Sequence, residues 1–294
     1  AELNMSAVAL TDKANMMGAF HFHRSIKKHN EDEKNQDKQI KPIIGCELNV
    51  CEDHADRTHR DDGYQTVFLA KNKTGYQNLI KMCSLGYTDG FYYLPRVDKK
   101  IVENFKNGLI VLSGDKYGEV SNKILNVGEN QAEDALMWWK SIFEDDYYLE
   151  LNRHGEEEED VVNQVLLKFS KKYSVKVVAT NTTKYIVKED ANAHDILLCV
   201  KDGEKQSTPI GKGRNFRYGL KNQEYYFKSS DEMNKLFKDL PDAITNIKEI
   251  VDKVDFYDLN RDVLLPKFTI PNDFSAKTDD IENEYLKHIT FLGA

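Results

Sequence analysis

Two histidines one residue apart are the first candidates for metal chemistry in this chain. His21 and His23 fall within residues 16–28, a stretch with a helical pattern. On a helix, side chains two positions apart point about 200° apart around the axis. The two imidazoles therefore cannot close on one metal ion, and we expect them to have surface and packing roles.

Other motifs that could carry chemistry have simpler interpretations. Residues 211–214 have the composition of a phosphate loop, but they lack the G-K-[ST] signature and a following helix, so we expect a flexible basic loop. His54 and His59 stand in a stretch rich in Asp and Arg that predicts an exposed loop. The acidic run 156–160 is typical of the first turn of a helix, where negative charge complements the helix dipole.

The elements that must position such residues alternate between short apolar runs and amphipathic helical patterns. Strands are predicted at 6–11, 43–50, 66–70, 109–112, 147–151 and 175–180, and helices at 16–28, 75–85, 131–143 and 161–173. This alternation predicts an α/β fold with a mainly parallel sheet, closed or open. Beyond residue 181 the pattern predicts a short strand at 224–228 and helices at 190–200, 231–237, 243–254 and from about 280.

Composition limits the class of protein. The net charge of -8 disfavours direct binding to a phosphate backbone. No apolar run approaches the roughly 20 residues that span a bilayer. The cysteines form no C-x-x-C pair, and they are Cys46, Cys51, Cys83 and Cys199. We therefore expect a cytoplasmic protein with reduced thiols and no membrane association.

Several short segments resemble one known family when they are taken together, in order and with their spacing. They are LTDKANM at 10–16, KPIIGCE at 41–47, FLAKNKTGY at 68–76, YLELNRHG at 148–155, and VVATNTTKY at 177–185 leading into AHDILLCV at 193–200. The first is similar to the L-T-D-H-G-N-M motif of that family. The resemblance is to the PHP (polymerase and histidinol phosphatase) domain of bacterial DNA polymerase III alpha subunits, and it covers nearly the whole chain.

The resemblance implies a distorted (βα)7-type PHP barrel with a mainly helical carboxy-terminal extension. We expect the PHP domain over residues 1–270, with the helical extension at about 186–260, and a truncated start of the polymerase palm over 271–294. The family's opening H-x-H motif would precede Ala1, so the first strand is expected to be missing or trimmed.

In active members of the family, the strand ends hold divalent metals for phosphoester hydrolysis. The resemblance implies that Glu47 retains a ligand position of the family and that His154 occupies a position where a ligand would be placed. Lys13 occupies the position of a ligand His, and a lysine has no lone pair to offer a metal. The other former metal-site positions are Asp12, Gln65, Asp115, Thr182 and Lys184.

These substitutions suggest that positive side chains replace the metal. We hypothesise that Lys13 or Lys184 reaches the carboxylates of Glu47, Asp12 or Asp115 and neutralises the former site.

The expected function is a non-catalytic scaffold within a DNA-directed DNA polymerase that uses Mg²⁺. No cofactor is expected in this chain, and Zn²⁺ or Mn²⁺ only if the PHP site is active. The expected partners are the rest of the alpha chain and, through it, DNA; docking of a proofreading exonuclease or other replicase subunits is left open. Local charge makes Arg214, Arg217 and Lys221 weak candidates for nucleic-acid contact.

Two alternatives to the scaffold remain. One is an active metal-dependent 3′–5′ exonuclease or phosphoesterase for proofreading. The other is a free-standing phosphatase of the histidinol phosphatase type, which leaves the polymerase-like segments at 68–76 and 193–200 without a role.

Overall fold

The computed structural model describes residues 2–3, 5–211, 213–260, 268–276 and 278–293. It divides into two compact units, Ala1–Asp258 and Leu259–Ala294. The first unit contains every described strand, and the second contains α10 (Ile281–Leu292). The assignment of residues 1–270 to a PHP domain and of 271–294 to a polymerase palm stays a prediction.

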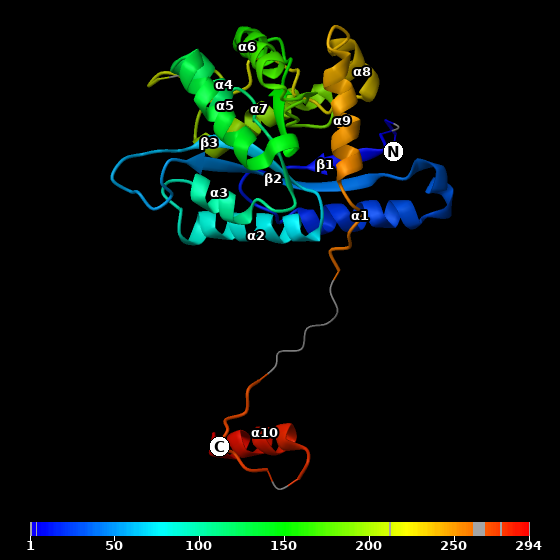
Figure 1. The fold of residues 1–294 in the computed structure, drawn as a ribbon, viewed down its shortest axis with the longest axis vertical. Coiled ribbons are helices and arrows are strands. Elements are labelled where there is room, and N and C mark those ends of the chain that lie inside the picture. The colour runs from blue at the N-terminus through cyan, green and yellow to red at the C-terminus, as the bar shows by residue number, and fades with distance from the viewer. Residues whose placement is uncertain (1, 4, 212, 261–267, 277, 294) are drawn as a thin grey trace. The chain divides into compact units, whose positions relative to one another are not determined.

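A mixed seven-stranded sheet forms the centre of the first unit (Figure 1). The strand order is β1-β2-β3-β5-β6-β7, and the two-residue β4 pairs with β2. The strands are β1 (Ala7–Leu10), β2 (Lys41–Cys51), β3 (Tyr64–Ala70), β4 (Val97–Asp98), β5 (Leu109–Leu112), β6 (Tyr147–Leu151) and β7 (Val177–Ala179). The six strands predicted up to residue 180 are confirmed.

One strand departs from the expected parallel arrangement. β3 is antiparallel to both β2 and β5, whereas the four other strand pairs are parallel. The reason is local: the chain between β2 and β3 contains no helix, so it cannot cross over and must turn back. This reversal brings the start of β3 to the edge where the parallel strands end.

Helices cover both sides of this sheet, with α1, α2 and α3 along one side of β2 and α4, α5, α6 and α9 along the other (Figure 1). The α-helices are α1 (Ala19–Glu31), α2 (Lys73–Thr88), α3 (Lys99–Phe105), α4 (Glu119–Asn126), α5 (Glu129–Phe143), α6 (Glu157–Tyr173), α7 (Ala191–Asp202), α8 (Ser230–Leu236) and α9 (Pro241–Lys253), and the 3-10 helices are η1 (Glu33–Lys38), η2 (Glu144–Asp146) and η3 (Lys188–Asp190). The arrangement confirms the distorted α/β barrel with a carboxy-terminal series of helices. None of the described helices combines the length and the apolarity needed to cross a membrane.

The main core packs the sheet against helices that include α2, α3, α5 and α6. Phe68 of β3, Trp139 of α5 and Phe169 of α6 are almost completely buried within it. The indole N–H of Trp139 donates a hydrogen bond to Glu119 Oε2 at 2.8 Å. This bond satisfies the one polar atom of the indole, so the ring can be buried without cost from an unpaired donor.

Two sequence-based boundaries were wrong for local reasons. Residues 224–228 form no strand and make only a single bridge between Tyr185 and Tyr226. Helix α1 begins at Ala19 instead of residue 16, because the preceding loop is tied to β2 through a bridge between Lys13 and Glu47. Ala14 in that loop has a φ of 52°, which a helix cannot contain.

Candidate functional site

The positions singled out from the sequence gather at one edge of the sheet. Parallel strands end at the same edge, which is where α/β folds place ligands. The antiparallel β3 contributes its beginning to that edge. The loops and strand positions involved carry Asp12 and Lys13 after β1, Glu47 on β2, Gln65 on β3, Asp115 after β5, His154 after β6, and Thr182 and Lys184 after β7.

Lys13 and Glu47 form an ion pair at this edge. The Ala14 N–H donates to Glu47 O at 2.7 Å, and the Glu47 N–H donates to Asp12 O at 3.1 Å. This backbone pairing brings Lys13 Nζ to 3.5 Å from Glu47 Oε1. This contact is the one expected between Lys13 and the Glu47 carboxylate, and the neutralisation of a former metal site by it stays a prediction.

Gln65 bridges the same pair. We assign the orientation of its amide from the neighbouring groups, because only with the nitrogen toward Glu47 are both amide atoms satisfied. It then donates to Glu47 Oε1 at 3.2 Å, and its oxygen accepts from Lys13 Nζ at 2.5 Å. One amide thus hydrogen-bonds both members of the ion pair. An open cleft of about 440 Å³ is lined by Lys13 and Gln65 and also by Arg60 and Tyr117.

Two further carboxyl groups interact electrostatically with Glu47. Burial raises the pKa of Glu47, Lys13 lowers it, and the charge of Asp115 raises it again. Burial also raises the pKa of Asp115, while the Tyr117 N–H, which donates to it, and the charge of Lys184 lower it. The site therefore combines carboxyl groups whose charges raise one another's pKa with lysines whose charges lower it.

Glu150 is the third carboxylate, and the sequence analysis missed it. Its pKa is raised to about 7, chiefly by burial and also by the charges of Asp115 and Glu47. Its Oε1 accepts a hydrogen bond from Thr180 Oγ1 at 2.5 Å, whereas its Oε2 has no hydrogen-bond partner among the described residues. An acidic residue in the middle of the apolar run of β6 was the available signal, because a fully buried strand rarely carries a charge.

Both ring nitrogens of His154 are already engaged. Its Nδ1 lies 2.6 Å from Glu159 Oε1, and its Nε2 lies 3.2 Å from the Thr182 backbone nitrogen. Since a backbone N–H can only donate, Nε2 is the acceptor and Nδ1 carries the proton that Glu159 accepts. The ring is also buried and stacked on Tyr225. The lone pair of Nε2 is therefore directed at the Thr182 N–H and is not free for a metal ion.

Lys184 acts at a longer range than Lys13. Its side chain is exposed, and its backbone N–H donates to Tyr225 O at 2.8 Å. No ion pair joins Lys184 to a carboxylate in the part of the chain that the structure describes, although its charge lowers the pKa of both Glu47 and Asp115. Of the two lysines, Lys13 makes the direct contact.

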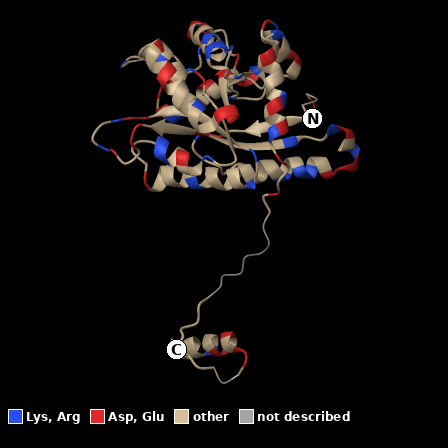
Figure 2. Cartoon of the chain, viewed as in Figure 1, with Lys and Arg blue, Asp and Glu red and all other residues tan. Residues whose placement is uncertain are grey.

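The candidates for nucleic-acid contact differ in their availability. Arg217 is buried, and its guanidinium donates two hydrogen bonds to Asp195, from Nη1 to Oδ1 at 2.7 Å and from Nη2 to Oδ2 at 2.9 Å. In this conformation Arg217 is therefore not accessible to a ligand. Lys221 lies 3.4 Å from carboxylates of both Glu156 and Glu158. Arg214 is exposed, and its role stays a prediction. Figure 2 shows charges of both signs interspersed along the outer helices.

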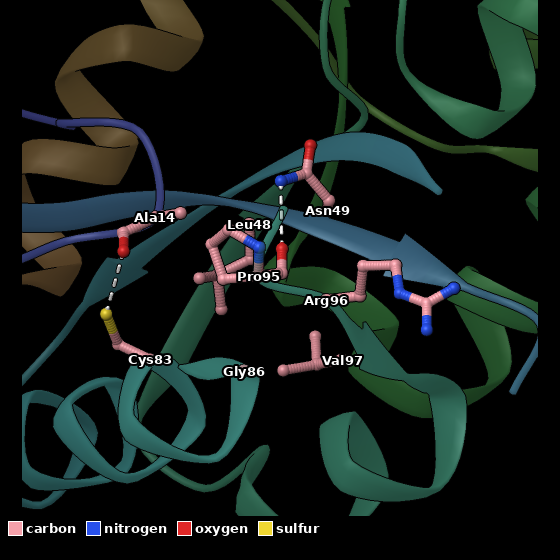
Figure 3. A pocket seen from close by; sticks show the side chains of 8 residues that line it. All are labelled: Ala14, Leu48, Asn49, Cys83, Gly86, Pro95, Arg96 and Val97. Atoms are coloured by element: carbon pink, nitrogen blue, oxygen red, sulfur yellow. Dashed lines mark hydrogen bonds between the residues drawn. The ribbon is translucent and has the colours of Figure 1, made fainter. Parts of the chain in front are cut away.

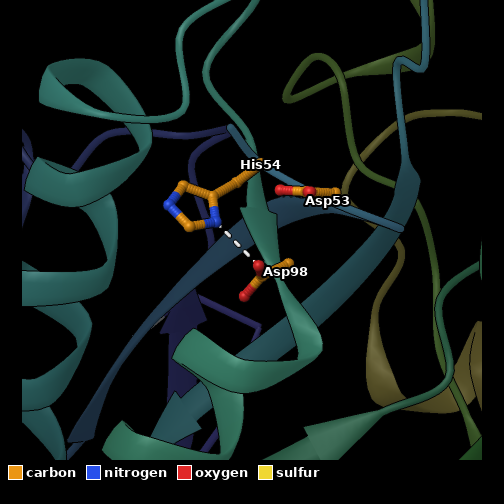
Figure 4. A group of neighbouring side chains, drawn as sticks. All are labelled: Asp53, His54 and Asp98. Carbon is orange, nitrogen blue, oxygen red and sulfur yellow. Dashed lines mark hydrogen bonds and ion pairs between the residues drawn. The ribbon is translucent and has the colours of Figure 1, made fainter. Parts of the chain in front are cut away.

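A second cluster of metal-type side chains consists of Asp53, His54 and Asp98, at the ends of the parallel strands β2 and β4 (Figure 4). The expectation of a freely solvated His54 was wrong, because its Nδ1 lies 2.7 Å from the buried Asp98 Oδ2. The other oxygen of Asp98 accepts from the Ile101 N–H and caps α3. These hydrogen bonds account for the arrangement, which fastens the loop after β2 to α3.

The fold and the residues at its edge identify the class of protein. The family model of the PHP domain matches residues 1–154. The chain belongs to the PHP domain family.

Curated relatives narrow this to one group of proteins. The chain is 37% identical over 295 residues to DNA polymerase III subunit alpha of Borreliella burgdorferi, an alignment that covers 99% of the chain and 24% of the relative. The same protein of Treponema pallidum is 34% identical over 296 residues, covering 99% and 24%. That of Thermus aquaticus is 36% identical over 301 residues, covering 98% and 23%. The chain is thus a homologue of the amino-terminal region of DNA polymerase III alpha subunits, and it spans about a quarter of their length.

Proposed function

We propose that this PHP domain serves as a non-catalytic scaffold of a DNA polymerase III alpha subunit, with a lysine in place of a metal. The observation that carries the proposal is the ion pair between Lys13 and Glu47, bridged by Gln65. An ammonium group at this position neutralises a carboxylate that would otherwise attract a divalent cation. The partners of the domain are then the remainder of the alpha chain and, through it, DNA.

The donor set supports this proposal because it does not fit a cluster of several divalent metals. Such clusters need imidazole or carboxylate lone pairs from several strand ends. Lys13 has no lone pair to offer, and the two nitrogens of His154 are occupied by Glu159 and Thr182. The carboxylates of Asp12, Glu47, Asp115 and Glu150 remain. The positive charge of Lys184 lowers the pKa of two of them, Glu47 and Asp115. We therefore derive no catalytic step through a metal at this site.

The second candidate function is a metal-dependent 3′–5′ exonuclease. The observation that favours it is that the charges of Glu47 and Asp115 act on the buried carboxyl of Glu150, since carboxylate oxygens are good ligands for Mg²⁺ and Mn²⁺. The unpartnered Oε2 of Glu150 adds to this. The two functions differ in whether the purified chain degrades DNA.

Hydrolysis of single-stranded DNA by the purified chain tests the proposed function. A 3′-labelled oligonucleotide is incubated with the chain in Mn²⁺, Zn²⁺ or EDTA. The scaffold predicts no hydrolysis beyond that of the Glu47→Gln variant under any condition. Metal-dependent release of nucleotides that is lost in Glu47→Gln would overturn the scaffold and establish the exonuclease.

Removing the lysines should create the cation affinity that they suppress. We expect the double variant Lys13→Ala, Lys184→Ala to bind Mn²⁺ about tenfold or more tightly than the wild-type chain, because each lost positive charge lowers the electrostatic repulsion of a divalent cation. Isothermal titration calorimetry with Mn²⁺ measures the change. Lys221→Ala is the matched control, since Lys221 contacts Glu156 and Glu158 instead. Equal affinities in all three proteins would contradict the replacement of metal by lysine.

A further inference from the structure

Two cysteines lie under the loop that carries Lys13. Cys46 on β2 is fully buried, and its Sγ is 3.6 Å from the carbonyl oxygen of Asn15. Cys83 on α2 is half-buried, and its Sγ is 3.1 Å from the carbonyl oxygen of Ala14, as Figure 3 shows. The two thiols thus meet consecutive carbonyls of one loop, from a strand and from a helix.

The thiols also act on each other. The Cys46 side chain lowers the pKa of Cys83 against the opposing effect of its partial burial, and the Cys83 side chain raises the pKa of Cys46. The other two cysteines do not share this interaction: the Cys51 thiol donates to Val97 O, and Cys199 lies on α7. A disulfide needs a thiol from each of two neighbouring segments, and β2 and α2 supply them here.

We propose that Cys46 and Cys83 form a reversible disulfide when the protein meets a peroxide, and that this disulfide releases the Lys13 loop. Cys83 reacts first because it is the more exposed of the two thiols. Its sulfur takes one oxygen from hydrogen peroxide, forming a sulfenic acid and one water. The Cys46 thiol then attacks that sulfur, the S–S bond forms, and the hydroxyl leaves with the Cys46 proton as a second water. The two thiols lose two electrons in total, and the peroxide gains them.

The expected consequence follows from the backbone of the loop. Ala14 has a φ of 52°, a left-handed conformation that is unfavourable for a residue other than glycine. The thiols of Cys83 and Cys46 hydrogen-bond the carbonyls of Ala14 and Asn15 and help to hold it there. A disulfide has no S–H to donate, so oxidation removes both of these bonds. The loop, and with it the ion pair of Lys13 and Glu47, becomes less firmly held.

Peptide mapping of the peroxide-treated chain tests the disulfide directly. The chain has four free cysteines, and we expect brief treatment with hydrogen peroxide to reduce the thiol count in denaturant from four to two. A non-reducing digest should contain one linked peptide joining Cys46 to Cys83, and dithiothreitol should abolish it. Hydrogen–deuterium exchange should be several-fold faster over residues 11–17 in the oxidised chain than in the reduced chain. Because wild-type protein is used, the test does not depend on a variant that folds.

Three variants sharpen the result. Cys199→Ser should lose the same pair of thiols as the wild type. Cys46→Ser should stop at a sulfenic acid on Cys83 that dimedone traps, and Cys83→Ser should form no linked peptide. The proposal is overturned if the wild-type digest lacks the Cys46–Cys83 link, or if exchange over residues 11–17 is unchanged in the linked protein. The inference is independent of the scaffold function, because it holds whether or not the site binds metal.

Discussion

Replacing Glu150 with glutamine should stabilise the chain at pH 8 by about 3 kcal/mol. Burial raises the pKa of Glu150 to about 7 from an ordinary value of 4.5. Each step of one in pKa corresponds to about 1.4 kcal/mol, which gives the size of the effect. The side-chain oxygen of glutamine keeps the hydrogen bond from Thr180. Its neutral NH₂ group replaces the unpartnered Oε2, so no negative charge is buried there.

The pH dependence of this effect has a definite sign. Between pH 4.5 and about 7 the unfolded chain has already released the proton of Glu150 while the folded chain still holds it. The unfolded state therefore binds fewer protons, and the contribution of Glu150 to stability falls as the pH rises through this window. Wild type and Glu150→Gln should be nearly equal in stability below pH 4.5 and should diverge up to about pH 8.

Urea denaturation at several pH values measures this difference. The control is Glu103→Gln, because Glu103 is an exposed glutamate on α3. Its free energy of unfolding should stay within about 0.5 kcal/mol of the wild type at every pH. A Glu150→Gln variant whose stability difference does not change with pH would show that Glu150 has the same pKa in the folded and the unfolded chain.

Replacing Arg96 with methionine should destabilise the chain by at least about 3 kcal/mol. Arg96 is 1% exposed, and it donates hydrogen bonds to four backbone carbonyls. Methionine fills a similar volume but leaves those oxygens without their donor, and each unsatisfied buried acceptor costs about 1–3 kcal/mol. The four acceptors are the carbonyl oxygens of His54, Asp56, Asp61 and Gly90.

Two measurements distinguish this effect from a general loss of stability. Urea denaturation gives the free energy of unfolding, and limited trypsin digestion reports on the loop between β2 and β3, which contains Arg57 and Arg60. We expect cleavage in that loop to be faster in Arg96→Met than in Arg24→Met, in which an exposed arginine of α1 is changed. Equal cleavage and equal stability of the two variants would mean that Arg96 does not hold the loop.

The strands and most helices could be predicted because their signals are local. The apolar runs at 109–112 and 147–151 coincide with β5 and β6. The two-residue β4 could not be predicted, since a strand this short has no pattern of alternation. The antiparallel direction of β3 depends on the loop before it. The sequence of that loop indicates that it contains no helix, but it does not indicate the path that the chain takes.

The site was only partly predictable because its members come from six strands and the loops that follow them. The resemblance of the sequence to the PHP domain was sufficient to single out Lys13 and Glu47, and their ion pair follows from a backbone bridge between the β1 loop and β2. Glu150 escaped notice because its importance lies in complete burial beside Asp115, which is a property of packing. The engagement of both nitrogens of His154 depends on Thr182, nearly thirty residues away, and no local pattern encodes it.

The amount of metal bound by the purified chain tests the central claim most directly. After equilibration with Zn²⁺ and Mn²⁺ and removal of free ions, elemental analysis gives the number of ions per chain. Replacement of the metal by Lys13 predicts sub-stoichiometric metal in the wild type and no decrease in Glu47→Gln. Two or more tightly held ions per chain, lost in Glu47→Gln, would contradict the account and would make the exonuclease the function to pursue.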